Sequence, residues 1–124
     1  MKKSIYGKMT DSEREVADYL KRVGLKWVFQ FPVFVYDERD RQRLWSPDFY
    51  IPKLGLYVEV CGSKEFDYEY RKEIYNKNGI PVVFLHYYKE PGKWKYFMAE
   101  RVKEIERERQ AEANKLKWSV EGER

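Results

Sequence analysis

The stretch from 46 to 61 constrains the fold most, because it consists of two apolar strands joined by one tight turn. A turn centred after residue 53 would pair Tyr50 with Tyr57 and Asp48 with Glu59 across antiparallel strands. Directly opposed side chains have Cβ atoms roughly 5 Å apart. The sequence therefore predicts a hairpin in which two carboxylates face each other among apolar residues.

Two opposed carboxylates repel each other unless a cation lies between them. A single Mg²⁺ or Mn²⁺ ion, about 2.1 Å from each carboxylate oxygen and completed by waters, fits such a gap. Because strand side chains alternate between faces, Cys61 shares the face of Glu59 and is expected beside the ion. In the alternative interpretation, Asp48 caps a turn and Glu59 is a solvated strand residue.

The rest of the chain is predicted to contain helices and further strands. The pattern from Thr10 to Glu13 is typical of a capping box and opens a helix that ends at Gly24. The other expected elements are a strand over 27–36 interrupted by Pro32, strands over 44–51 and 56–61, a helix over 64–78, a strand over 80–86, and a helix from 91 to about 117. The predicted order is αβββαβα.

Pro47-Asp48, followed by Glu59-Val60-Cys61 on a hydrophobic strand, resembles the motif of the PD-(D/E)XK nuclease family, with Cys61 at the place of the family's lysine. The resemblance extends over residues 10–90 and implies an α/β fold with a restriction-endonuclease-like core, a mixed sheet flanked by helices. It also implies a metal-dependent endonuclease that hydrolyses phosphodiester bonds, in DNA rather than RNA. Asp48, Glu59 and the backbone carbonyl of Cys61 would hold Mg²⁺ or Mn²⁺.

The resemblance also draws attention to Glu13 and to the substituted lysine. Several branches of the family carry a glutamate on the first helix, and Glu13 resembles that position, although it also completes the capping box with Thr10. The family's lysine orients the attacking water and offsets charge on the phosphate. Cys61 cannot do this, because an ordinary thiol with a pKa near 8.5 is mostly neutral at pH 7.

A cation from elsewhere in the chain is therefore expected to replace the lysine. The second predicted helix offers Arg71 and Lys72, and Lys64 follows the motif strand. Arg71 stands four residues before Tyr75, and related nucleases place a polar residue and a tyrosine with that spacing near the site. The alternative for each cation is a solvated surface side chain.

Other chemically active residues have simpler interpretations. His86, the single histidine, ends a predicted buried strand and is interpreted as a packing residue rather than a general base. Cys61 is interpreted as a small core residue, because a zinc site would need further His or Cys residues nearby. Trp45 and Tyr50 lie beside the motif and could stack on bases, whereas most other aromatic residues follow core spacing. The arginines of the first predicted turn could contact phosphates or pair with neighbouring acids: Arg39, Arg41 and Arg43.

Length and composition limit the remaining possibilities. A chain of 124 residues forms a single domain with one core. Its net charge of +4 lies in residues 1–99, because acids and bases balance over 100–124, and a mildly basic domain suits a phosphate-bearing partner. One cysteine excludes an internal disulfide. The sequence contains no run of 18 apolar residues and no signal-peptide pattern, which predicts a cytoplasmic protein without a membrane partner.

The last predicted helix continues as a charged extension over 106–124, beyond any core that one domain offers. The end of this extension carries Leu116, Trp118 and Val120, which could dock on a second copy and favour a homodimer. Two alternatives to the nuclease remain. The chain could be a nucleic-acid-binding module of the same fold whose catalysis lapsed at Cys61, or a structural subunit that assembles through its last helix.

Overall fold

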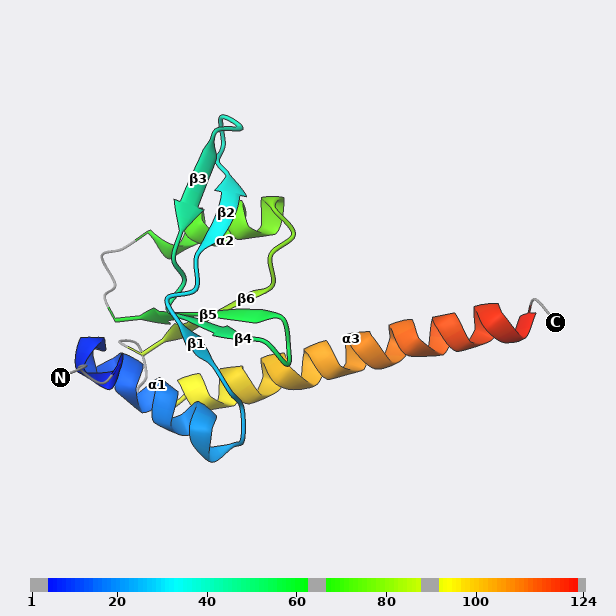
Figure 1. Cartoon of the computed structure of the whole chain (residues 1–124), viewed down its shortest axis with the longest axis horizontal. Coiled ribbons are helices and arrows are strands. Elements are labelled where there is room, and N and C mark those ends of the chain that lie inside the picture. Colours follow the sequence, from blue (N-terminus) through cyan, green and yellow to red (C-terminus); the bar gives the residue numbers. More distant parts are fainter. Residues whose placement is uncertain (1–4, 63–66, 88–91, 123–124) are drawn as a thin grey trace.

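The computed structural model describes residues 5–62, 67–87 and 92–122 (Figure 1). A short 3₁₀ helix, Ile5–Lys8, precedes the main elements. In chain order these are α1 (Asp11–Arg22), β1 (Val28–Phe29), β2 (Val33–Tyr36), β3 (Gln42–Trp45), β4 (Phe49–Ile51), β5 (Leu56–Cys61), α2 (Tyr68–Lys77), β6 (Val82–His86) and α3 (Trp94–Gly122).

The strands form two sheets. The larger has the order β1-β4-β5-β6, in which β5 and β6 are parallel and the other neighbours are antiparallel. The smaller is the antiparallel hairpin β2-β3, which rises from the larger sheet on the side of α2 (Figure 1). The protein is therefore a mixed α/β structure with a mixed sheet and three α-helices in its described part, which confirms the prediction at this level.

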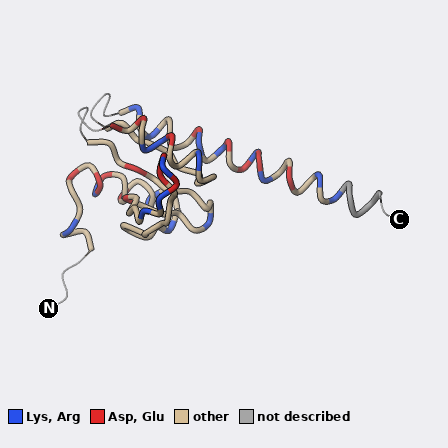
Figure 2. The backbone as a smooth tube through the Cα atoms, turned by 90° about the horizontal axis from the view of Figure 1, so that it is seen from above, with Lys and Arg blue, Asp and Glu red and all other residues tan. Residues whose placement is uncertain are grey.

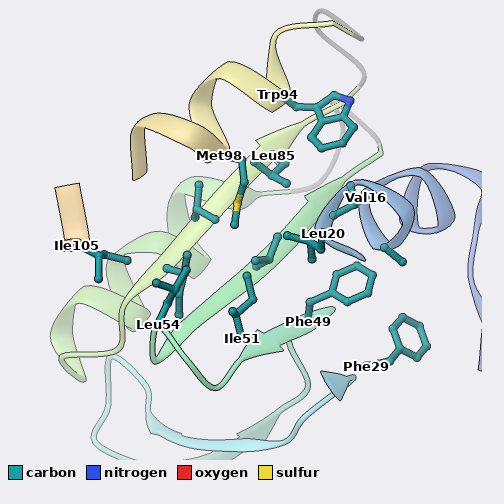
Figure 3. Close-up of a cluster of buried hydrophobic side chains, with 14 of the residues drawn as sticks. Val16, Leu20, Phe29, Phe49, Ile51, Leu54, Leu85, Trp94, Met98 and Ile105 are labelled. Atoms are coloured by element: carbon teal, nitrogen blue, oxygen red, sulfur yellow. The ribbon is translucent and has the colours of Figure 1, made fainter. Parts of the chain in front are cut away.

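Helices cover both faces of the larger sheet. α1 and α3 lie on one face, where Leu20, Trp94 and Met98 pack against Phe49 and Leu85 in the main core (Figure 3). Fully burying one such side chain contributes about 1.5–3 kcal/mol. α2 lies on the opposite face, where a second, smaller cluster includes Val35, Ile74 and Tyr75. The small hairpin and α2 thus share their own packing, separate from the main core.

The start of α1 is formed as the sequence predicts. The hydroxyl of Thr10 accepts a hydrogen bond from the Glu13 N–H at 3.2 Å, and the Thr10 N–H donates to Glu13 Oε1 at 2.8 Å. These two bonds satisfy donors that a helix leaves unpaired at its N-terminus. The helix then buries one stripe of side chains: Val16, Ala17 and Leu20.

The predicted strand over 44–51 is wrong, because the chain leaves one sheet and enters the other at Ser46–Asp48. Trp45 ends β3 and Phe49 begins β4. Pro47 has no N–H with which to form a hydrogen bond to a neighbouring strand. The Asp48 carbonyl accepts a hydrogen bond at 2.9 Å from the N–H of Gln30, which follows the edge strand β1 of the larger sheet. The predicted strand over 27–36 likewise divides into β1 and β2 around Gln30, which has a positive φ of 54°.

The remaining differences concern ends of elements. α2 begins at Tyr68 rather than at 64, and residues 63–66 lie outside the described part. β6 begins at Val82, two residues later than predicted, after Pro81. α3 runs from Trp94 to Gly122 and so passes the predicted end at about 117. The observed order therefore has two more strands before α2 than the predicted order αβββαβα.

α3 extends away from the rest of the protein (Figure 1). Among the side chains of α3 that are described, up to residue 117, Ile105 is the last buried one, and those from 106 to 117 are exposed. Acidic and basic residues alternate along this part (Figure 2). Arg109 anchors it by donating to the carbonyls of Lys53 and Leu54 at 2.7 and 2.5 Å. The side chains of Trp118 and Val120 lie outside the described residues, and none of the described helices combines the length and apolar composition needed to cross a membrane.

Candidate active site

Asp48 and Glu59 meet on the sheet face that α2 covers. Tyr50 is paired with Tyr57, as predicted, and the same register places Asp48, just before β4, opposite Glu59. The Asp48 N–H donates to Glu59 Oε1 at 3.1 Å, and the Val60 N–H donates to Asp48 Oδ2 at 2.7 Å. Each carboxylate is thus held by backbone of the opposite strand, which fixes the two acids as a pair.

The charges of this pair are poorly compensated. Burial and the neighbouring Glu59 carboxylate raise the pKa of Asp48 to about 8. Glu59 is 7% exposed, and its own pKa is raised by burial, although Arg71 opposes this effect. The site therefore holds fewer negative charges at neutral pH than two ordinary carboxylates would, and a second cation would allow both acids to ionise.

Within the described part of the chain, Arg71 is the cation that pairs with these acids. Its Nε lies 2.8 Å from Glu59 Oε2, and its Nη2 donates to the Tyr75 hydroxyl at 3.2 Å. The guanidinium also lies 4.4 Å from the centroid of the Trp45 ring. The contacts with Glu59, Tyr75 and Trp45 together fix the orientation of the guanidinium, because this planar group can stack on a ring while its N–H groups pair with a carboxylate.

The contact with Trp45 was not predicted from the sequence. Trp45 was expected to be available for base stacking, but its ring packs edge-on against Tyr75 at 5.3 Å between centroids and lies against Arg71. The signal in the sequence was the spacing of Arg71 and Tyr75, which places both on one side of α2. The position of Trp45 depends on how the small hairpin packs against α2, which local spacing does not reveal.

Glu13 serves the capping box and also lies beside the acidic pair. Its carboxylate is close enough to contribute, after burial and Glu59, to the raised pKa of Asp48. It raises the pKa of Glu59 as well. The capping box is therefore confirmed, and a role of Glu13 at a metal site stays a prediction that its place near the acidic pair allows.

Cys61 is fully buried beside Glu59. Its thiol lies 3.8 Å from the Glu59 carbonyl oxygen, and burial together with the carboxylates of Glu59 and Asp48 raises its pKa to about 12. The sulfur is therefore a neutral thiol at pH 7 and neither supplies a positive charge nor acts as a nucleophile. This environment agrees with its interpretation as a small core residue.

Other candidates are placed elsewhere. Lys72 is exposed and lines a separate cavity of about 570 Å³ between α2, β6 and α3, so it does not join the acidic pair. Lys64 lies outside the described residues. His86 is the parallel neighbour of Cys61, and its ring packs edge-on against Tyr68 at 5.6 Å, as expected for a packing residue.

Three arginines in the β2-β3 turn and at the start of β3 contact one buried acid, Asp37. The Nε atoms of Arg41 and Arg43 both lie 3.1 Å from Asp37 Oδ2, and the N–H groups of Arg39 and Arg41 donate to Oδ1 at 2.9 Å. Burial alone would raise the pKa of Asp37, but these hydrogen bonds and charges hold it well below its ordinary value. Arg41 and Arg43 therefore pair with an acid of the same hairpin.

The side chains that could bind a metal ion here are two carboxylates, Asp48 and Glu59. In the described part of the chain, no three His, Cys, Asp or Glu side chains form a group that could hold a metal ion. Mg²⁺ is commonly bound through one or two carboxylates, with waters and substrate phosphates as the other ligands. Asp48 and Glu59 fit that pattern, since both supply hard oxygen ligands, and burial is the main cause that raises the pKa of each.

No protein-family model, curated protein or solved structure matches the chain.

Proposed function

We propose that the protein is a metal-dependent endonuclease of the PD-(D/E)XK type, with a restriction-endonuclease-like core, which hydrolyses phosphodiester bonds in DNA. The observation that best supports this proposal is the pairing of Asp48 with Glu59 on neighbouring strands, at partly buried positions. The Arg71 Nε lies 2.8 Å from the Glu59 carboxylate. Two acids that only stabilised a hairpin would be expected at exposed positions, where water screens their repulsion.

The acidic pair would bind the divalent cation, Mg²⁺ or Mn²⁺, through the carboxylate oxygens of Asp48 and Glu59, with the Cys61 carbonyl as a further oxygen ligand. The cation would lower the pKa of a bound water and offset charge on the phosphate. Because the Val60 N–H already orients Asp48, that carboxylate is held in one direction before a ligand arrives. Such preorganisation lowers the cost of forming the transition state.

Arg71 would take the role of the family's lysine. Its guanidinium is always charged, and its contact with Trp45 holds it beside the acids. A phosphate bound at the Asp48–Glu59 pair would lie next to both the divalent cation and the positive charge of Arg71. Cys61, as a neutral buried thiol, would only fill space behind Glu59.

Cleavage of labelled DNA tests this proposal. Purified protein with Mg²⁺ or Mn²⁺ is expected to cut at least one of a duplex, a flap, a junction and a single strand, and to lose the activity in EDTA. Asp48→Asn and Glu59→Gln, which keep size and shape, are expected to abolish cutting. Metal-independent binding without cleavage by the unaltered protein would contradict the proposal and favour the lapsed binding module. Absence of both cleavage and salt-dependent binding would favour a structural subunit.

A further inference from the structure

A ladder of stacked aromatic rings lies next to the acidic pair. The rings of Tyr50 and Tyr57 are 4.6 Å apart with planes at 28°, and Phe31 stacks on Tyr50 at 5.1 Å and 22°. Tyr50 follows Asp48 by two residues, and Tyr57 precedes Glu59 by two. Since alternate strand residues share a face about 6.6 Å apart, the ring pair and the carboxylate pair are neighbours on one face.

This stacking distinguishes the ladder from the rings of the core. The ring pairs of the main core are steeply inclined, from 56° for Phe29–Phe49 to 84° for Trp27–Phe49 and 86° for Tyr19–Trp94. Both inclined and stacked pairs are favourable, but a parallel stack ends in a flat ring face on which another ring can stack. Phe31 forms that end, and it is 41% exposed.

The chemistry of the ladder matches a base rather than a phosphate. Phe31, Tyr50 and Tyr57 carry no formal charge at neutral pH, and burial raises the pKa of Tyr57 further. A neutral aromatic face next to charged groups is the arrangement with which proteins bind unpaired nucleotides: bases stack on rings while charged groups contact the backbone. A base inside a continuous duplex has both faces covered by its neighbours and cannot stack in this way.

We propose that Phe31, at the end of the Phe31–Tyr50–Tyr57 ladder, binds an unpaired base next to the bond that is cut. This inference rests on the proposed nuclease function and narrows its substrate to nucleic acid with unpaired nucleotides at the site, such as single strands, flaps or splayed junctions. The alternative is a ladder that only stabilises the β4-β5 hairpin through cross-strand contacts.

Binding measured in EDTA, where no cleavage occurs, tests the ladder separately from the nuclease. Fluorescence anisotropy with a labelled oligothymidine and with its duplex is expected to give tighter binding of the single strand. Phe31→Ala is expected to weaken single-strand binding about five- to tenfold, the lower part of the range for one stacked base. Its effect on duplex binding is expected to be small, and Phe31→Tyr, which keeps a ring, should bind like the unaltered protein.

Phe97 provides the matched control, because it is a phenylalanine on α3 that is 54% exposed. Phe97→Ala should bind both oligonucleotides like the unaltered protein. Equal single-strand binding by the unaltered protein and Phe31→Ala would overturn the inference, as would an equal loss for single strand and duplex. Cleavage of duplex DNA by a protein that fails this test would leave the nuclease intact. Ring-dependent single-strand binding without any cleavage would contradict the nuclease, and with it the position of the base beside a cut bond, but would retain Phe31 as a base-binding residue.

Discussion

Asp48→Asn is expected to stabilise the protein at neutral pH. The pKa of Asp48 is about 8 in the folded protein and 3.8 for an ordinary aspartate. Between these values the unfolded chain has released the proton while the folded chain keeps it, so the stability falls as pH rises. At about 1.4 kcal/mol for each pH unit, the Asp48 carboxyl costs the folded state roughly 4 kcal/mol at pH 7. Asparagine removes this cost and can still accept the hydrogen bond from Val60.

Urea unfolding at pH 5 and pH 7 in EDTA measures the effect. From pH 5 to pH 7 the unaltered protein should lose about 3 kcal/mol through Asp48, and Asp48→Asn should lose much less. Asp18→Asn, which replaces an exposed acid of α1, should follow the unaltered protein. The account of an uncompensated acidic pair is wrong if Asp48→Asn is less stable than the unaltered protein at pH 7. It is also wrong if Asp48→Asn loses as much stability between pH 5 and pH 7 as the unaltered protein does.

Three further changes test individual residues and the last helix. Arg71→Ala should slow cleavage about 100-fold, equivalent to about 3 kcal/mol of transition-state stabilisation, with Lys72→Ala as an unaffected control; equal rates for the two variants would exclude Arg71 as the substitute for lysine. Cys61→Ser should change the rate of cleavage little, because the thiol is neutral at pH 7; complete loss would assign the sulfur a direct role. Light scattering should find a dimer for the full chain and a monomer for a chain ending at Gln110, and a monomer in both cases would refute the dimer.

Local patterns in the sequence predicted the parts of the site that depend on neighbours along the chain. The short turn fixed the pairing of Tyr50 with Tyr57 and so the opposition of Asp48 and Glu59. The capping box fixed the start of α1 and with it the direction of Glu13. In both cases the geometry follows from hydrogen bonds within about ten residues.

Features that depend on packing between distant segments could not be predicted in this way. Arg71 and Lys72 are adjacent in sequence, and only the rotation of α2 against the sheet decides which one reaches Glu59. The stretch 44–51 is predicted as one strand because Trp45, Tyr50 and Ile51 favour strands on either side of Pro47, but the hairpin packs on α2 and β3 belongs to a separate sheet. Tertiary contacts of this kind commonly override local preference.

Titration of Mn²⁺ into the protein by isothermal calorimetry tests the acidic pair most directly. At pH 7 in two buffers of different ionisation enthalpy, we expect a single bound ion and the release of about one proton, because Asp48, with a pKa of about 8, must lose its proton to bind a metal. Asp48→Asn should lose this binding. Absence of Mn²⁺ binding in the unaltered protein, or binding that Asp48→Asn retains in full, would contradict the proposal that Asp48 and Glu59 form a metal site.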